Sequence, residues 1–534
     1  MKLKQYLSKY NKPLYKNLLF VILFFIIALT YYTIPVLNSG PLSHHIWRQT
    51  DCLSLTKNYY EGAKFFEPEL HCLLADNYTT GKTAFEFPVL YYTVSQIWKI
   101  FGVSYLSFRI LYLLIVFTGL FAFYKTLNIL LEDSFWSITL TLLLFTSPVY
   151  AFYGISFIAD AQAFSLILIA LYLFVMYAIK QRLFLFYISM LFFALAGLIK
   201  VSSLIAFIFL LCIFFLELFP VKTLVKRKLF IRPHIEWTGF VIVLLIVFSW
   251  YLYANYYNSI HGFKYTLMNI IPIWDIEKEK IETFIQGLKE HTSYVFFSRV
   301  VLYGLLFVGL INLFLFRKIP LFAYLSNILI FIGGLSYFIL WGRALNNHDY
   351  YFIALLILFP GILLPFILYI KTNYIQIFRG AITKVFVCVL LLFNITYCYS
   401  IIKLKTRAQS GNFIFVGSHE LVRGLRWVNW DTEYNCMRFA TIEPYNRSIG
   451  IQKDDKVISI SDPSPNGSLF LMNQKGWTGF YCQRKSEQIN FFIEKGAKYL
   501  FISDLKLLDE SFLQPFINDP IGNYKDIIIF RLKH

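Results

Sequence analysis

Eleven long apolar runs occupy most of residues 17–402 of this chain. An apolar run of about 20 residues crosses a bilayer as a helix, because a helix satisfies its own backbone where water is absent. The chain is 58% hydrophobic and only 15% charged, whereas soluble domains carry about 25% charged residues. We therefore predict an α-helical polytopic membrane protein with about eleven spans: 17–36, 105–128, 134–152, 161–179, 183–199, 201–218, 236–254, 296–316, 320–340, 350–370 and 385–402.

Basic residues fall in alternate loops between these runs. If the N-terminus is cytoplasmic, the inner loops hold the lysines and arginines, as the positive-inside rule requires. They are Lys180, Arg182, Lys222, Lys226, Arg227, Lys228, Arg232, Arg317, Lys318, Lys371, Arg379 and Lys384. The net charge of +18 is thus explained by topology, and we expect no nucleic-acid partner. The first loop, residues 37–104, and everything after the last span are then outside.

The composition changes after residue 404. We predict a membrane domain over residues 1–404 and a small soluble α/β domain over residues 405–534. Its expected strands and helix are 456–461, 498–503, 526–532 and, for the helix, 486–495. The segment Asp462-Pro-Ser-Pro-Asn-Gly-Ser is rich in turn-forming residues. If both outer regions meet an oxidising compartment, Cys52–Cys72 and Cys436–Cys482 are candidate disulfides.

Two further segments of the predicted outer face have helical character. An amphipathic stretch at 88–101 in the first loop is expected to lie along the membrane interface. An acid-rich run at 275–290 is either a mobile lid or a solvated helix.

Three carboxylic acids lie where this topology predicts the outer membrane surface. Asp51 follows the first span beside two histidines and is a candidate general base or metal ligand. An interfacial ion pair with Arg48 is the competing interpretation. Glu86, between two phenylalanines, is costly to desolvate without a partner. Asp160 precedes the fourth span, where an acid indicates function and can also cap the helix.

Basic and aromatic side chains are expected on the same face. Lys200 lies between two apolar runs, so its ammonium group either binds a lipid phosphate or extends to the interface for solvation. Arg343, His348 and Tyr350 follow the ninth span. We expect His348 to bind phosphate, to shift the pKa of a neighbouring carboxylate, or to have a structural role. With Arg48, these four residues make up the predicted substrate-binding set.

These elements, in their order and sidedness, resemble the GT-C superfamily of polyprenyl-phosphate-dependent glycosyltransferases. They are similar to the branch that contains the aminoarabinose lipid A transferases and the protein O-mannosyltransferases. The resemblance rests on Asp51, Phe85-Glu86-Phe87-Pro88, Ser107-Phe108-Arg109, Asp160, Gly197-x-x-Lys200 and His348-Asp349-Tyr350-Tyr351. This chain has Phe87 where the aminoarabinose transferases have a lysine for the donor phosphate. It has Cys52 where the protein O-mannosyltransferases have a glutamate.

The resemblance implies transfer of a sugar from undecaprenyl or a similar polyprenyl phosphate, with inversion of the anomeric centre. The departing phosphate is a stable anion, so the site needs a base beside the acceptor and positive charge at the phosphate. Asp51 is the implied base, while Glu86 and Asp160 orient the acceptor or join Asp51 in holding a divalent metal. The acceptor is lipid A, a surface glycan, a protein or another lipid. The implied location is a bacterial inner membrane, with the site and C-terminal domain extracytoplasmic.

Three other classes compete with a transferase of this kind. A flippase or transporter of lipid-linked saccharides predicts charges near mid-bilayer and often repeated halves. The charges of this chain gather at the outer ends of spans instead, and the sequence shows no internal repeat. An O-antigen ligase-like enzyme normally has a longer late outer loop. A sensor or assembly protein would act through its C-terminal domain.

Overall fold

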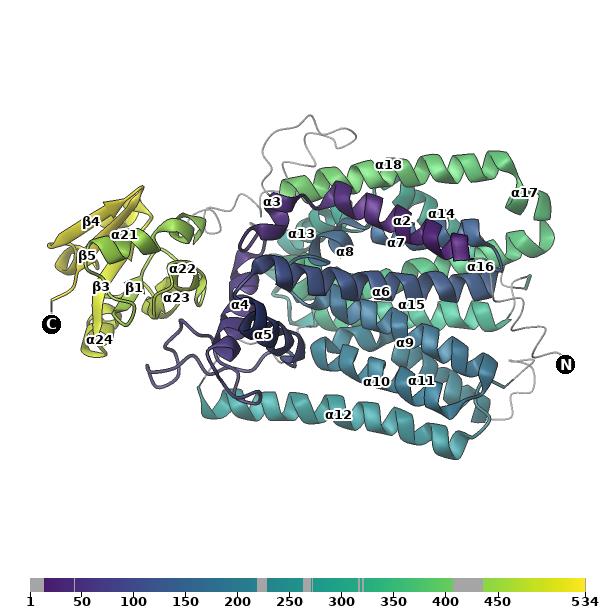
Figure 1. Ribbon diagram of the computed structural model, residues 1–534, viewed down its shortest axis with the longest axis horizontal. Coiled ribbons are helices and arrows are strands. Elements are labelled where there is room, and N and C mark those ends of the chain that lie inside the picture. Colours follow the sequence, from purple (N-terminus) through teal and green to yellow (C-terminus); the bar gives the residue numbers. More distant parts are fainter. Residues whose placement is uncertain are drawn as a thin grey trace.

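The computed structural model describes residues 14–42, 44–218, 228–262, 270, 272–315, 317–318, 321–406 and 436–533. Most of them form a bundle of long apolar helices, and a small sheet domain lies at one end of it (Figure 1). Within these ranges, seven helices are long and apolar enough to cross a membrane, and four shorter apolar helices coincide with other predicted spans. The polytopic helical fold is thus confirmed, while the count of eleven spans stays a prediction.

The bundle helices follow the predicted spans, and three of these spans are interrupted at one end of the bundle. Pro148 separates α7 from α8, since proline has no N–H to donate. The short 3₁₀ helices η1 and η4 precede α11 and α16, and the nine residues of η4 are unusually many for a 3₁₀ helix. The bounds are α2 Leu14–Tyr31, α6 Tyr105–Leu131, α7 Ser134–Phe145, α8 Pro148–Tyr153, α9 Asp160–Lys180, α10 Leu183–Ile199, η1 Val201–Leu204, α11 Ile205–Leu218, α12 Pro233–Ile260, α14 Arg299–Phe314, α15 Leu321–Asn347, η4 Asp349–Ile357, α16 Leu358–Asn373, α17 Ile375–Arg379 and α18 Ala381–Lys405.

The first loop contains three further helices, α3 Ile34–Asn38, α4 Ile46–Tyr60 and α5 Val89–Phe101. The amphipathic stretch is α5, which buries Tyr91, Val94 and Trp98 and exposes Ile100 and Phe101. This division fits a helix that lies against the bundle at an interface. The acid-rich run forms η2 Ile273–Asp275, η3 Lys278–Lys280 and α13 Ile281–Val295.

The C-terminal domain is a five-stranded mixed sheet in the order β2-β1-β3-β5-β4. β1 pairs in parallel with β2 and β3, and β5 pairs antiparallel with β3 and β4. Its elements are η5 Arg438–Thr441, α21 Glu443–Ser448, β1 Lys456–Ser459, α22 Gly467–Leu471, β2 Gly476–Thr478, α23 Gly479–Cys482, α24 Ser486–Glu494, β3 Ala497–Ile502, η6 Leu505–Asp509, η7 Gln514–Phe516, β4 Pro520–Tyr524 and β5 Ile527–Arg531. The predicted strands match β1, β3 and β5, and the predicted helix matches α24. The predicted start of this domain, residue 405, is the last residue of α18, and residues 407–435 lie outside the described ranges.

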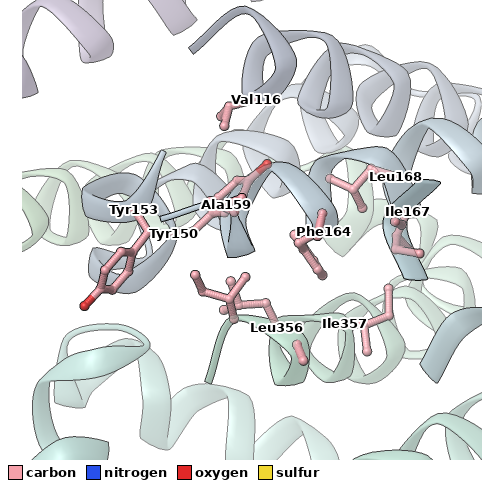
Figure 2. Close-up of a cluster of buried hydrophobic side chains, with 14 of the residues drawn as sticks. Val116, Tyr150, Tyr153, Ala159, Phe164, Ile167, Leu168, Leu356 and Ile357 are labelled. Atoms are coloured by element: carbon pink, nitrogen blue, oxygen red, sulfur yellow. The ribbon is translucent and has the colours of Figure 1, made fainter. Parts of the chain in front are cut away.

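A core of apolar side chains joins α6, α8, α9 and η4. Figure 2 shows this cluster, with Val116 from α6, Tyr150 from α8, Phe164 from α9 and Leu356 from η4. α6 approaches α9 closely at Gly119, where an added Cβ atom would lie 2.7 Å from the Ser165 side chain. Small residues permit such contacts between membrane helices. This core fixes the helix ends from which the polar residues described below project.

The basic residues Lys180 and Arg379 lie at the end of the bundle opposite the C-terminal domain (Figure 1). α17 and the start of α2 are far from the sheet domain (Figure 1). Asp160 begins α9 beside the first loop, so Lys180 at the other end of α9 lies at the far end. Arg379 in α17 is exposed there. This separation agrees with the charge pattern, while the orientation in a membrane stays a prediction.

Candidate active site

Helix α4 carries the first part of the site. Its N-cap residue, His45, has a left-handed backbone (φ 53°, ψ 45°), which is uncommon for a residue other than glycine. Arg48 and Asp51 are three residues apart and therefore lie on one face of the helix. Arg48 Nη1 is 3.8 Å from Asp51 Oδ2, and Asp51 is fully buried. A buried carboxylate requires charged or hydrogen-bonding partners.

Glu86 completes the first ion pair across the loop. It pairs with Arg48 and accepts a hydrogen bond from the Tyr91 hydroxyl. The ring centroid of Phe85 lies 4.4 Å from the Arg48 guanidinium carbon, which keeps the cation in place. Burial raises the pKa of Glu86, but the charges of Arg48 and then Lys200 outweigh burial and hold that pKa below its ordinary value. Glu86 is therefore a carboxylate at neutral pH.

Lys200 and Asp160 form a second ion pair next to the first. Lys200 Nζ is 3.0 Å from Asp160 Oδ1, and it lies 4.1 Å from the ring centroid of Tyr351 and 5.3 Å from that of Tyr350. The Lys200 side chain keeps 22% of its surface exposed, against 9% for Asp160. Asp160 also begins α9, where a negative charge favours the helix dipole. The cation of this pair is thus the member that an incoming anion can reach.

Asp349 is fully buried and lies at the centre of a third group. His44 Nε2 is 3.1 Å from Asp349 Oδ2, and His45 Nε2 is 3.3 Å from Asp349 Oδ1. Tyr153 donates a hydrogen bond from its hydroxyl, and Lys405 forms an ion pair with the same carboxylate. Burial, followed by the charge of His44, lowers the pKa of His45 to about 4. His45 is therefore neutral at pH 7.

Within the described ranges, His44, His45 and Asp349 are the one group of three ligand residues whose ligand atoms all lie within 4.8 Å of one another. Such a group is compatible with a divalent metal. Lys405 already neutralises the Asp349 carboxylate, so a metal ion would have to lie beside an ammonium group. The group fits an internal ion pair better than a metal centre. The predicted ligands have other partners: Asp51 has Arg48 and Asn466, Glu86 has Arg48, and Asp160 has Lys200.

The C-terminal domain reaches into this site through one loop. Asn466 Nδ2 donates a hydrogen bond to Asp51 Oδ1. Asp462 shapes the loop, because its carboxylate accepts from the backbone N–H of Ser464 (2.8 Å) and of Ser468 (2.7 Å). The sequence marks this segment as turn-rich but contains no signal that it meets Asp51. The contact arises only when the two domains dock.

Backbone pairing fixes that docking. Leu73 of the first loop forms a parallel bridge with Gly476 at the edge strand β2. Gly476 donates to the Cys72 carbonyl (3.1 Å), and Leu74 donates to the Gly476 carbonyl (3.2 Å). The Trp477 indole N–H donates to the Leu74 carbonyl (2.9 Å). The first loop therefore extends the sheet of the C-terminal domain.

The candidate disulfides are not formed in the structure. Cys52 packs in the bundle core with its Sγ 3.1 Å from the Tyr91 hydroxyl, whereas Cys72 packs in the core of the C-terminal domain. No disulfide joins Cys436 to Cys482. Neither of the two possible pairings is therefore present, and the two cysteines of the first loop belong to different cores.

Arg109, from the Ser107-Phe108-Arg109 element, anchors the start of the first loop. Its guanidinium is fully buried and, within the described residues, donates its hydrogen bonds to backbone carbonyls. These belong to Val36, Leu37, Ser39, Gly40 and Ile155. The residue is structural, and it holds the segment that leads to α4.

The structure separates Arg343 from the other predicted binding residues. His348 and Tyr350 join the site, since the His348 ring lies 5.3 Å from both the His45 and the Tyr350 rings. Arg343 is exposed and instead lines a cavity of about 210 Å³ beside α13. Sequence reasoning missed Lys405, whose only signal is a lysine at the predicted outer end of an apolar span.

Comparisons with known proteins show which fold the chain has. No family model matches the chain, and no curated protein matches it either. ArnT from Cupriavidus metallidurans, both in the apo state and bound to undecaprenyl phosphate, matches with a TM-score of 0.56 and 10% identity. The match covers 96% of this chain and 97% of that chain. The chain has the GT-C fold. An Archaeoglobus fulgidus oligosaccharyltransferase, solved with Zn and sulfate, is less similar, with a TM-score of 0.47, 14% identity, and 91% and 68% coverage of the two chains.

Proposed function

We propose that this protein is a glycosyltransferase that moves a sugar from a polyprenyl-phosphate donor to an acceptor on the outer face of a bacterial inner membrane, with inversion. The GT-C fold supports the general class, and one of the ArnT structures contains undecaprenyl phosphate. The observation that carries the proposal is the setting of Asp51. A fully buried carboxylate lies between a cation, Arg48, and an amide of a second domain, Asn466.

The side chains present match the needs of this reaction. A polyprenyl phosphate leaves as a stable anion, so protonation of the leaving group is not required. A base must take the acceptor proton as the new bond to the anomeric carbon forms, and we assign this role to Asp51. Positive charge must stabilise the departing phosphate, and Lys200 and Arg48 supply it next to Asp51 and Glu86. Direct attack from the face opposite the phosphate inverts the anomeric centre.

The donor phosphate must compete with Asp160 for Lys200. Because the two charges lie 3.0 Å apart, Asp160 both holds the cation in place and opposes the incoming anion. We expect Lys200→Met to weaken binding of undecaprenyl phosphate about tenfold or more, since a charged hydrogen bond contributes about 1.5–3 kcal/mol. We expect Asp160→Asn to tighten the same binding, because the competing charge is removed.

Binding of undecaprenyl phosphate to the purified protein in nanodiscs, followed by native mass spectrometry, measures both changes. Lys99→Met is the matched control, because Lys99 is an exposed lysine on α5 of the same loop. Equal loss of binding in Lys99→Met and Lys200→Met would show that the lysines act only on the membrane surface potential. Absence of any binding by the wild-type protein would refute the proposed donor class.

A further inference from the structure

Asn466 presents a buried hydrogen-bond acceptor next to the candidate base. Its amide orientation is fixed, because a carboxylate such as Asp51 can only accept, so the NH₂ group must face it. The Asn466 side chain is fully buried, and its Oδ1 atom has no hydrogen-bond partner within the described residues. A buried acceptor left in this state costs about 1–3 kcal/mol. A ligand that donates a hydrogen bond there would remove that cost.

We propose that Asn466 Oδ1 binds the acceptor substrate, and that this acceptor is a glycan whose reacting hydroxyl has a second hydroxyl on the neighbouring carbon. The proposal rests on the proposed role of Asp51. During transfer the acceptor oxygen bonds to the anomeric carbon, the bond to the phosphate oxygen breaks, and the phosphate leaves with its electron pair. The single hydroxyl proton goes to the Asp51 carboxylate. Asn466 Oδ1 therefore needs a different hydrogen, which a neighbouring hydroxyl supplies.

Two other acceptor chemistries fit less well. A phosphate group offers oxygen acceptors and, when fully ionised, no hydrogen to donate to Asn466 Oδ1. A serine or threonine peptide offers a hydroxyl and an N–H, but extended peptides are commonly held by addition to a free sheet edge. The edge near this loop is β2, which Leu73 and Leu74 already occupy. A sugar with adjacent hydroxyls matches two oxygen acceptors side by side.

Chemical treatment of the acceptor tests the substrate class. Purified protein in liposomes is incubated with a panel of radiolabelled undecaprenyl-phosphate sugars and a bacterial cell-envelope fraction, and transferred label is counted. Periodate cleaves the carbon–carbon bond between two adjacent hydroxyl-bearing carbons, so we expect periodate treatment of the envelope fraction to abolish its acceptor capacity. Proteinase K and phosphatase treatment should leave that capacity intact. Capacity that survives periodate, or that is lost to proteinase K or phosphatase, would overturn the proposal.

Variants of the C-terminal loop test the residue. We expect Asn466→Ala to lower transfer about tenfold at limiting acceptor, since one hydrogen bond in the site is lost, with undecaprenyl phosphate binding unchanged. The acid limb of the pH–rate profile should move to higher pH, because Asp51 loses an N–H donor that stabilises its charged form. Asn473→Ala is the matched control: Asn473 accepts from Lys57 of the first loop and donates to Glu443.

The outcomes separate this inference from the proposed function. If Asn466→Ala behaves like Asn473→Ala, or loses transfer with no change in the pH profile, the amide only holds the domains together and the inference is wrong. If the wild-type protein transfers no sugar from any donor in the panel, the proposed function fails and the inference fails with it. A wild-type activity that depends on Asp51 but not on Asn466 overturns the inference alone.

Discussion

The ion pair between Lys405 and Asp349 ties the end of the last bundle helix to the start of η4. The side chains are 1% and 0% exposed, respectively. Removing one member of a buried pair leaves the other charge uncompensated and costs about 3–5 kcal/mol. His44 Nε2 lies 3.1 Å from the same carboxylate and stays as a partner of Asp349 in the variant. We therefore expect Lys405→Met to lower the free energy of unfolding by about 3 kcal/mol, the low end of that range.

A double-mutant cycle isolates this interaction. Adding Asp349→Asn to Lys405→Met removes both charges, so most of the lost stability should return and the coupling energy should reach about 2 kcal/mol. Steric trapping of the protein in detergent–lipid micelles measures the unfolding free energies. Additive effects of the two substitutions would refute the reasoning.

Two further predictions concern the loop and its histidines. Arg109→Met leaves several buried carbonyls without donors, at about 1–3 kcal/mol each, so we expect a loss of about 4 kcal/mol or more, measured by the same trapping method; a neutral effect would contradict the anchoring role. The pKa of His45 is lowered to about 4 in the folded protein, so the unfolded state binds more protons between that value and its own pKa of about 6.5. Stability should therefore fall by about 3 kcal/mol as the pH decreases across this window, and His45→Gln should flatten the profile; an equal slope in the variant would count against the assignment.

Much of the bundle could be predicted because lipid imposes a simple rule on sequence. Each span needs a long apolar run, and basic residues mark one side. Three strands of the C-terminal domain also follow from their apolar pattern. β2 is missed because it has only three residues and begins with Gly476, and β4 is missed because Pro520 and Gly522 are poor strand formers.

The site could be predicted as a set of residues but not as a set of pairs. A shared membrane boundary brings Asp51, Glu86, Asp160 and Lys200 to one level, and the structure places them in adjoining ion pairs. The shared boundary does not predict that Arg48 forms an ion pair with Glu86 across the loop. Nor can any local pattern reveal the contact of Asp51 with Asn466, which lies 415 positions away in the sequence. Such contacts depend on how the first loop docks on the edge of the sheet.

Asp51 is the proposed base in transfer from a polyprenyl-phosphate sugar. The direct measurement is transfer of labelled sugar from undecaprenyl-phosphate sugars to an envelope fraction by wild-type protein and by Asp51→Asn in liposomes. We expect the variant to bind undecaprenyl phosphate as before but to transfer sugar about 10²–10⁴-fold more slowly, because this is the usual contribution of a general base. Transfer at the wild-type rate by a folded Asp51→Asn protein would contradict this role for Asp51.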